Sequence, residues 1–287
     1  MNANYKTVLY ANLDKAECSV KIHTDLNHYI GGMAQGMAIT LNGARNFPIT
    51  FNIGPLSGIF PFASKTAVVY LKEDGALGES YGGGRLALVM KMAGLDALVF
   101  TGKSQVPLGL LLKNTESSFV VLDKKSKLEK FKKEGFSGKR SLVEFSKNTL
   151  IDSYFSFGDE DLGKTARGKN LVAIMISGTK SYKIANPQYF ERLYFGILSK
   201  PKELAVSFMG FKSCGGCPAG CRFSKAGEDS KNSAVLPRCL VSCQYAAHIY
   251  KDVPRVFSIL ESLGYHYNHD DLEQIAGQVG KLRARFK

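Results

Sequence analysis

Short runs rich in hydrophobic and β-branched residues fill the first two thirds of the chain, and glycine turns separate them. Short apolar runs of this kind, bounded by turn residues, are typical of β-strands. The pattern predicts strands at residues 5–12, 18–23, 66–71, 97–101, 108–112 and 171–176, the first two joined as a hairpin. Residues 83–93 have helical composition and end at Gly94. We therefore expect layered β-sheets with few long helices in this part of the chain.

The pattern changes after the dipeptide Asn186-Pro187, which is typical of a helix start. Beyond it, the composition predicts helices at residues 188–202, 240–250, 254–263 and 270–286. The sequence thus predicts an α+β protein of two domains. A β-rich domain covers residues 1–185, and a small helical domain covers residues 186–287.

The composition is that of an ordinary globular protein, with 45% hydrophobic and 22% charged residues. No apolar run approaches the length of a membrane span, and the N-terminus lacks the pattern of a signal peptide. We therefore expect a cytoplasmic protein with no membrane partner. Its six cysteines are too sparse for a disulfide framework, and in a reducing compartment their thiols stay available to a metal.

The formal net charge is +13, and two basic stretches at residues 124–133 and 281–287 carry much of it. No nucleic-acid-binding motif surrounds the first stretch, so no nucleic-acid partner is expected. A solvated helix face is one explanation of the first stretch. A docking surface for an acidic redox protein such as a ferredoxin is the other, and the sequence leaves both open.

Three cysteines separated mainly by glycine carry the strongest chemical signal: Cys214, Cys217 and Cys221, spaced CxxCxxxC. Glycine lets the backbone curl so that such thiols converge, and iron–sulfur clusters are held by cysteine thiolates at spacings of this kind. Structural zinc sites usually combine two short cysteine knuckles, whereas this run offers one. We therefore predict an iron–sulfur cluster, with zinc and no metal as the alternatives.

A [4Fe–4S] cluster needs four ligands, and two further cysteines, Cys239 and Cys243, follow the run. Their spacing of four places both thiols on one face if the segment is helical. Either is a candidate for the fourth ligand, and we favour Cys239 because the preceding Pro237 indicates a turn. The alternative is that both are small buried apolar side chains, as is common for free cysteines.

Five segments in this order resemble the aldehyde ferredoxin oxidoreductase family of tungsten or molybdenum bis-pyranopterin enzymes. The segments are YIGGMAQGM at 29–37, GPLSG at 54–58, GGGRLALVMKMAGLDALVFTG at 82–102, GKNLVAI at 168–174 and CGGCPAGC at 214–221. The resemblance implies a first domain of twisted β-sheets that forms a base for the pterin, in an anaerobic oxidoreductase setting. It also implies that the three cysteines of the run match three of the four ligands of a [4Fe–4S] cluster.

The sequence departs from the family at positions that would hold the pterin. Lys65 stands where the family has an arginine, and Tyr81 aligns with an asparagine that helps hold a magnesium between the pterin phosphates. A tyrosine ring cannot replace a carboxamide as a magnesium ligand. Arg238 falls in a segment that is acidic in the family, and the chain is shorter than the family's enzymes, whose later part supplies the fourth cysteine. The sequence therefore does not support a tungsto- or molybdopterin.

We expect an iron–sulfur electron-transfer protein on this scaffold, without catalytic residues of its own. One alternative is a subunit of a split tungsten or molybdenum oxidoreductase completed by a larger partner chain, and another is a cofactor-free interaction protein. A remnant of cofactor binding is expected at the glycine loop before the predicted helix, where backbone amides can receive a phosphate. The residues expected there are Lys65, Gly82, Gly83, Gly84 and Arg85.

Overall fold

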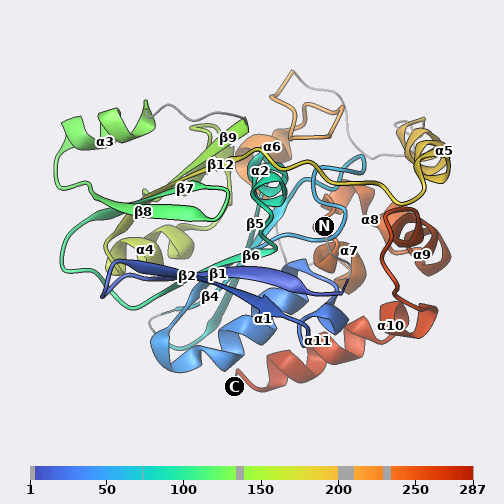
Figure 1. The fold of residues 1–287 in the computed structure, drawn as a ribbon, viewed down its shortest axis with the longest axis horizontal. Helices are drawn as coiled ribbons and strands as arrows, with labels where there is room; N and C mark the ends of the chain where they lie inside the picture. Colours follow the sequence, from blue (N-terminus) through green and yellow to red (C-terminus); the bar gives the residue numbers. More distant parts are fainter. Residues whose placement is uncertain (1–3, 73, 134–138, 200–209, 229–233, 287) are drawn as a thin grey trace.

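Two six-stranded β-sheets form the frame of the molecule, and helices cover them (Figure 1). The structure is a computed structural model and describes residues 4–72, 74–133, 139–199, 210–228 and 234–286. The mixture of two sheets with helices confirms the predicted α+β class. The predicted division at residue 185 remains a prediction.

The first sheet has the strand order β2-β1-β6-β3-β4-β5. Strands β1 and β2 form the predicted antiparallel hairpin, and β1 pairs with β6 in parallel. All other pairs in this sheet are antiparallel. Its strands are β1 (Lys6–Asn12), β2 (Glu17–His23), β3 (Ile49–Asn52), β4 (Thr66–Leu71), β5 (Leu77–Gly82) and β6 (Ala97–Thr101).

The second sheet has the order β11-β10-β9-β12-β7-β8, in which only β7 and β12 pair in parallel. Four of its strands fall in stretches where the sequence predicted none, namely β8, β9, β10 and β11. Its strands are β7 (Leu108–Lys113), β8 (Glu116–Val121), β9 (Lys139–Glu144), β10 (Leu150–Ile151), β11 (Phe155–Ser156) and β12 (Leu171–Gly178).

Alternating side chains of the first sheet enter two separate cores. In β4, Val68 and Tyr70 point into the core between the sheets, whereas Ala67 and Val69 point into the core on the opposite face. Helices α2 (Leu86–Ala93) and α4 (Glu160–Gly168) contribute to the core between the sheets. Helix α3 (Lys125–Lys132) buries Phe131 against the outer face of the second sheet, and α1 (Gly32–Asn42) packs on the first.

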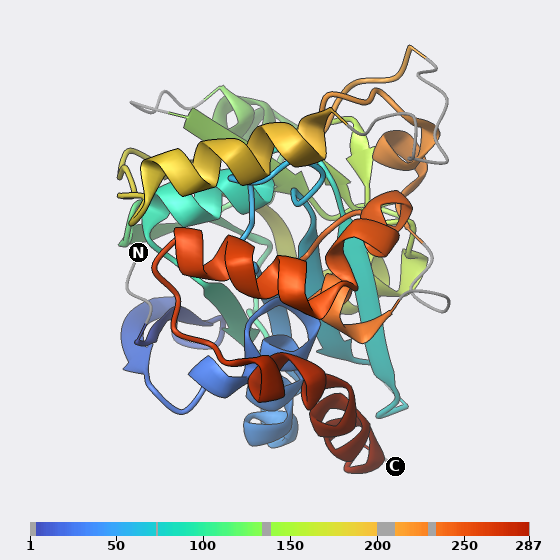
Figure 2. The same ribbon diagram turned by 90° about the vertical axis from the view of Figure 1, so that its right-hand side faces the viewer.

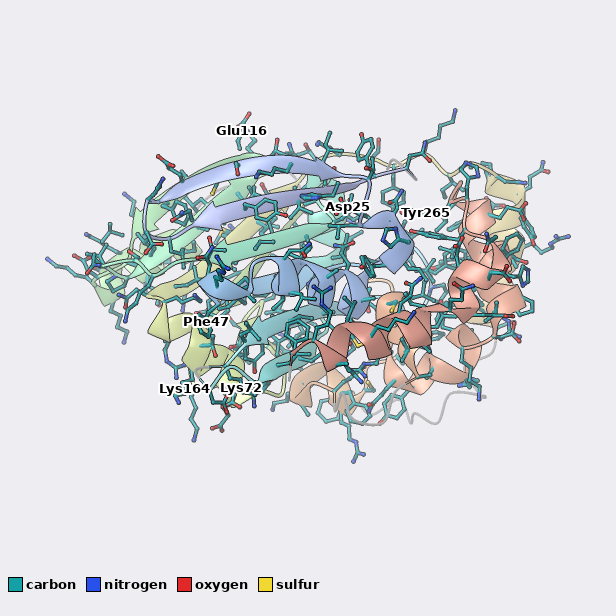
Figure 3. All side chains as sticks on the ribbon, turned by 90° about the horizontal axis from the view of Figure 1, so that it is seen from below. Asp25, Phe47, Lys72, Glu116, Lys164 and Tyr265 are labelled. Atoms are coloured by element: carbon teal, nitrogen blue, oxygen red, sulfur yellow. The ribbon has the colours of Figure 1, made fainter. Side chains whose placement is uncertain are left out.

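Most of the helices described after residue 186 pack beside α1 on the first sheet (Figures 2 and 3). Figure 2 shows α5 and α9 running alongside each other, and Figure 3 places Tyr265 between the N-terminal sheet and these helices. The helices are α5 (Pro187–Leu198), α6 (Arg222–Ala226), α7 (Val235–Cys239), α8 (Ala247–Tyr250), α9 (Val253–Ser262), α10 (His269–Glu273) and α11 (Ile275–Ala284). Short 3₁₀ turns lie at η1 (Asn27–Tyr29), η2 (Ala44–Asn46) and η5 (Gln244–Ala246). None of the helices in the described part of the chain has the length and apolarity that crossing a bilayer requires.

The prediction of one helix over residues 240–250 is wrong. Helix α7 ends at Cys239, and Val241 adopts a left-handed conformation with φ 55°, which a helix cannot contain. The amide of Cys243 then donates to the carbonyl of Phe62, 2.7 Å away, rather than to its own segment. A tertiary contact has therefore replaced the helical hydrogen bond.

Other helix boundaries also differ from the predictions. The predicted helix 270–286 divides at Gln274 into α10 and α11. Helix α2 starts at Leu86 rather than at residue 83, because Gly84 is left-handed. Helix α1 was not predicted, and it is buried from Gly32 to Thr40, so its sequence lacks an amphipathic period. The predicted end of the helix 188–202 lies partly outside the described residues.

Three glycines of the first part allow the segment 238–241 to approach the sheet closely. A Cβ atom on Gly54 would lie 2.7 Å from the carbonyl oxygen of Cys239, and one on Gly31 would lie 3.2 Å from it. Gly32 has φ +49°, and a Cβ there would overlap the carbonyl of Arg238. The backbone of the helical part thus lies directly on these glycines.

A buried lysine, Lys91, lies in the last turn of α2. Lys91 is 3% exposed, and its ammonium donates to the carbonyl of Pro55. Burial lowers the pKa of Lys91 to about 7, although the Asp96 carboxylate acts in the opposite sense. The folded protein therefore holds this proton less tightly than the unfolded chain does.

Replacing Gly32 by alanine is expected to lower the free energy of unfolding by about 1–3 kcal/mol, because the new Cβ overlaps the Arg238 carbonyl at a left-handed position. Gly277→Ala in α11 is the control, since nothing lies within 4 Å of its Cβ position. This control should stabilise the helix by about 0.5–1 kcal/mol. Urea unfolding of both variants measures the difference, and equal effects would contradict the packing described.

Lys91 should make stability depend on pH. Between pH 7 and about 10 the unfolded chain binds the proton that the folded protein has lost, so the free energy of unfolding rises with pH. The wild type should therefore gain more than about 1.4 kcal/mol relative to Lys91→Met between pH 7 and 10. Subtracting the variant's free energy of unfolding from that of the wild type at each pH cancels the contributions of the other titrating groups. A gap that stays constant with pH would refute the lowered pKa.

Candidate functional site: the cysteine loop, Lys65 and Cys243

The cysteine run docks onto the glycine loop that precedes α2. The amide of Gly215 donates to the carbonyl of Gly84 at 2.7 Å. A Cβ atom on Gly83 would lie 2.5 Å from the sulfur of Cys214, so only glycine leaves space for this thiol. The structure therefore brings together two sites that the sequence predicted separately.

Lys65 lies beneath this contact and forms a buried ion pair. Its ammonium is 2.9 Å from Glu228 Oε1, and the two side chains are 2% and 5% exposed. Burial alone would lower the pKa of Lys65, but the Glu228 carboxylate outweighs it and the pKa is raised. Cys214 and Cys243 act on Lys65 in the same direction, which places both thiols in its surroundings.

Two backbone hydrogen bonds hold Cys243 beside Lys65. The amide of Lys65 donates to the carbonyl of Val241 at 3.1 Å, and the amide of Cys243 donates to the carbonyl of Phe62 at 2.7 Å. Phe62 and Val241 are both left-handed, with φ 61° and 55°. Such conformations are rare for bulky residues, and strain of this kind is concentrated at functional sites. We call this pair of hydrogen bonds the 62–243 clasp.

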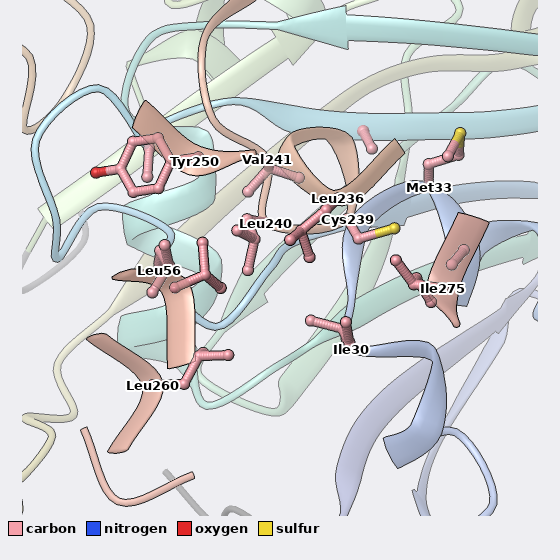
Figure 4. Packing of buried hydrophobic residues seen from close by; sticks show 14 of the residues in the cluster. Ile30, Met33, Leu56, Leu236, Cys239, Leu240, Val241, Tyr250, Leu260 and Ile275 are labelled. Atoms are coloured by element: carbon pink, nitrogen blue, oxygen red, sulfur yellow. The ribbon is translucent and has the colours of Figure 1, made fainter. Parts of the chain in front are cut away.

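Cys239 lies elsewhere, in the hydrophobic core. Its side chain is fully buried, and Figure 4 shows it among Met33, Leu236 and Ile275. Burial raises the pKa of Cys239 to about 12, and no other cysteine contributes to that rise. The geometry thus favours Cys243, not Cys239, as the thiol closest in environment to the cysteine run, because the chain turns at Val241.

The thiols of the run are neighbours, but they do not form a closed metal site. Burial raises the pKa of Cys217 to about 12, and Cys214 and Cys221 add to the rise. Within the described residues, no three His, Cys, Asp or Glu side chains are close enough to hold a metal ion. Thiols are the donor type that iron–sulfur clusters use, and two of these thiols also act on the buried ammonium of Lys65. Binding would require them to lose their protons and turn toward one centre.

A second cluster contains Tyr81 and Arg238, two of the positions at which the sequence departs from the family it resembles. Arg238 Nε donates to the hydroxyl of Tyr81 at 3.0 Å, and the Arg238 guanidinium also binds the Glu79 carboxylate. Arg283 from α11 binds the other oxygen of Glu79 at 3.0 Å. Burial and the neighbouring Arg283 lower the pKa of Arg238 to about 10, which leaves it charged at neutral pH. We call these four residues the Glu79 network.

The remaining predicted site residues line the glycine loop. Gly82 ends β5, and a Cβ there would lie 2.6 Å from the ring of Phe157. Arg85 is more than half exposed, and its Nε lies 3.3 Å from Asp152. The carbonyl of Gly84 accepts the amide of Gly215, so the cysteine loop covers this turn. Phosphate binding at the turn remains a prediction.

Two acidic residues of these clusters, Glu228 and Glu79, escaped the sequence analysis. Glu228 lies in a polar stretch that reads as a linker, and Glu79 lies in a strand where acidic residues are ordinarily exposed. Lys65 follows an apolar run at residues 59–63, and this could have indicated Glu228, because a buried ammonium requires a counter-charge.

Replacing Glu228 by glutamine removes the charge opposite Lys65 while preserving the shape of the side chain. The free energy of unfolding should fall by about 3–5 kcal/mol, because a buried ammonium is left unpaired. Glu160→Gln is the matched control, since its partner Lys147 is 3.7 Å away and both side chains are exposed. Denaturant unfolding should show almost no change in the control. Equal losses in both variants would contradict the buried pair.

Comparison with known proteins finds one family model and one solved structure that this chain resembles. Residues 8–134 match the family model described as "Aldehyde ferredoxin oxidoreductase, N-terminal domain". A solved structure of the active site complex BamBC of benzoyl coenzyme A reductase, in complex with 1,5 dienoyl-CoA, has a TM-score of 0.64 and 17% identity. The match covers 99% of this chain and 60% of that one. At this identity the likeness shows a shared fold, and the chain spans only about 60% of the length of that relative.

Proposed function

Because residues 8–134 are an aldehyde ferredoxin oxidoreductase N-terminal domain, we propose that the chain is an iron–sulfur electron-transfer protein on this scaffold. Its cluster ligands are Cys214, Cys217, Cys221 and Cys243. The observation that carries the proposal is the 62–243 clasp, which holds Cys243 beside the same buried lysine as Cys214.

Lys65 has a defined role in this proposal. A [4Fe–4S] cluster, when bound, takes up and releases one electron, and its potential depends on burial and on the charges around the sulfurs. Four thiolates concentrate negative charge, and Lys65 is a permanently protonated, buried cation next to two of them. Its ammonium therefore stabilises the thiolates of Cys214 and Cys243, and Glu228 fixes its position.

The Glu79 network supports the proposal that this chain holds no pterin cofactor of its own. Tyr81 and Arg238 stand at two positions where the resemblance implied pterin-site residues, and here they bind each other and Glu79. Their hydrogen-bonding groups are directed at one another rather than left for a cofactor. A tungsto- or molybdopterin held by this chain alone would have to break a buried ion pair, at a cost of several kcal/mol.

A second candidate is one subunit of a larger oxidoreductase. The structural relative belongs to a structure named as the active site complex BamBC, and the match covers 60% of that relative's chain. A partner chain would then supply the rest of a tungsten or molybdenum site. Metal analysis of the complex isolated from native cells separates the candidates, because only this one requires tungsten or molybdenum. An acidic redox protein such as a ferredoxin is the electron partner expected for the first candidate.

Anaerobic purification and reconstitution with iron and sulfide test the leading proposal. The wild type should be brown and carry about four iron and four sulfide per chain. Cys243→Ser should convert the four-iron signal in electron paramagnetic resonance to a three-iron signal, because one corner loses its thiolate. Cys239→Ser is the matched control, and it should keep the four-iron signal while lowering stability by about 1–3 kcal/mol through a buried hydroxyl.

The opposite results have distinct meanings. A three-iron signal in Cys239→Ser alone would show that the chain rearranges around residue 241 and that the clasp does not select the ligand. Colourless wild-type protein that cannot be reconstituted would refute the electron-transfer proposal. The subunit of a larger oxidoreductase and the cofactor-free interaction protein would then remain, and metal analysis of the native complex separates those two.

A further inference from the structure

A large cavity lies away from the cysteines, at the C-terminal end of α2. Its volume is about 910 Å³, enough for a nucleotide-sized ligand. Helix α2 has eight residues, so its two ends are about 12 Å apart. The glycine loop and the cysteines lie at the first end, and the cavity lies at the second.

Four separate segments form the walls of the cavity, and hydrogen bonds between them hold it open. They are residues 4–7, 91–96, 180–185 and 263–266. The amide of Lys180 donates to the carbonyl of Met92 at 2.8 Å, and the amide of Asp96 donates to the carbonyl of Thr7 at 2.8 Å. Just beyond the lining residues, the amide of Asn186 donates to the carbonyl of Ser262 at 3.0 Å. The cavity is therefore a preformed part of the fold.

The lining is basic, chiefly through Lys180 and Lys183. It contains Lys91, Lys180, Lys183 and His266, against one carboxylate, that of Asp96. Asp96 Oδ2 already accepts the amide of Thr7 at 2.8 Å, so this carboxylate is engaged in holding the wall. Concave surfaces lined by one sign of charge concentrate the potential and attract ligands of the opposite sign.

Aromatic and hydroxyl groups complete the lining. Tyr182 is half-buried, and its ring centroid lies 5.9 Å from the ammonium of Lys91. Tyr5, Thr7 and Ser181 also line the cavity. Lysines that bind phosphate as point charges, combined with aromatic rings for a flat group, are the chemistry that recognises a nucleotide.

We propose that this cavity binds a phosphate-bearing ligand of nucleotide size, with Lys180 and Lys183 contacting the phosphates. Lysines near a helix C-terminus also offset the negative end of its dipole, which would account for Lys180 beside Gly94. That explanation does not extend to Lys183 and His266, which belong to other segments of the wall. The site uses none of the cysteines and is independent of the electron-transfer proposal.

Calorimetric titration of the full chain with ADP, pyrophosphate and adenosine tests the site. ADP should bind most tightly, pyrophosphate more weakly, and adenosine at least tenfold more weakly than ADP, because the lysines act on the phosphates. The double variant Lys180→Gln/Lys183→Gln should bind ADP at least tenfold more weakly than the wild type. Both lysines are exposed, so the variant is expected to fold, and its circular dichroism and unfolding midpoint verify this.

Lys124→Gln/Lys125→Gln at the start of α3 is the matched control, because it removes the same charge from exposed positions outside the cavity. This control should bind ADP like the wild type. Equal weakening in both double variants would show non-specific attraction to a basic protein and overturn the site. Absence of ADP and pyrophosphate binding at millimolar concentration would overturn it as well, whatever the outcome of iron reconstitution.

Discussion

The close approach of the segment 238–243 to the first sheet is the constraint on which the rest of the structure depends. The carbonyls of this segment rest on three glycines, and the 62–243 clasp fixes the end of the segment next to Lys65. One approach therefore sets three things at once: Cys239 enters the core, Cys243 stays beside Lys65, and Arg238 reaches Glu79. A side chain on Gly32 or Gly54 would separate all of them from their partners.

Charge is handled in two different ways in the two buried clusters. Lys65 and Glu228 form a simple pair, whereas Glu79 is shared by two arginines and a tyrosine. The second arrangement has two guanidinium groups for one carboxylate. Burial lowers the pKa of Arg238, and the neighbouring positive charge of Arg283 lowers it further. This arrangement also connects α7, α11 and β5, which are far apart in the sequence. The polar groups of this region are thus directed toward one another.

The sequence predicted those features whose signal is local. Strands such as β4 and β6 have the correct bounds because their apolar runs end at polar or glycine residues, and the cysteine run was evident from spacing alone. The helix α1 was missed because it is buried on all sides, and the turn at Val241 was missed because a bond to Phe62 creates it. The choice between Cys239 and Cys243 depended on that turn. No spacing rule could therefore have decided it.

Helix α2 touches both the cysteine loop and the basic cavity, and this gives the fold a mechanical property. Its first turn follows Gly84, whose carbonyl accepts the amide of Gly215. Its last turn contains Lys91, which lines the cavity. The backbone hydrogen bonds of an eight-residue helix keep its two ends at a fixed separation of about 12 Å. A ligand at one end that changed the tilt of α2 would therefore also act on the other end, and by linkage the influence would be equal in both directions. One short helix thus connects two chemically unrelated places in this molecule.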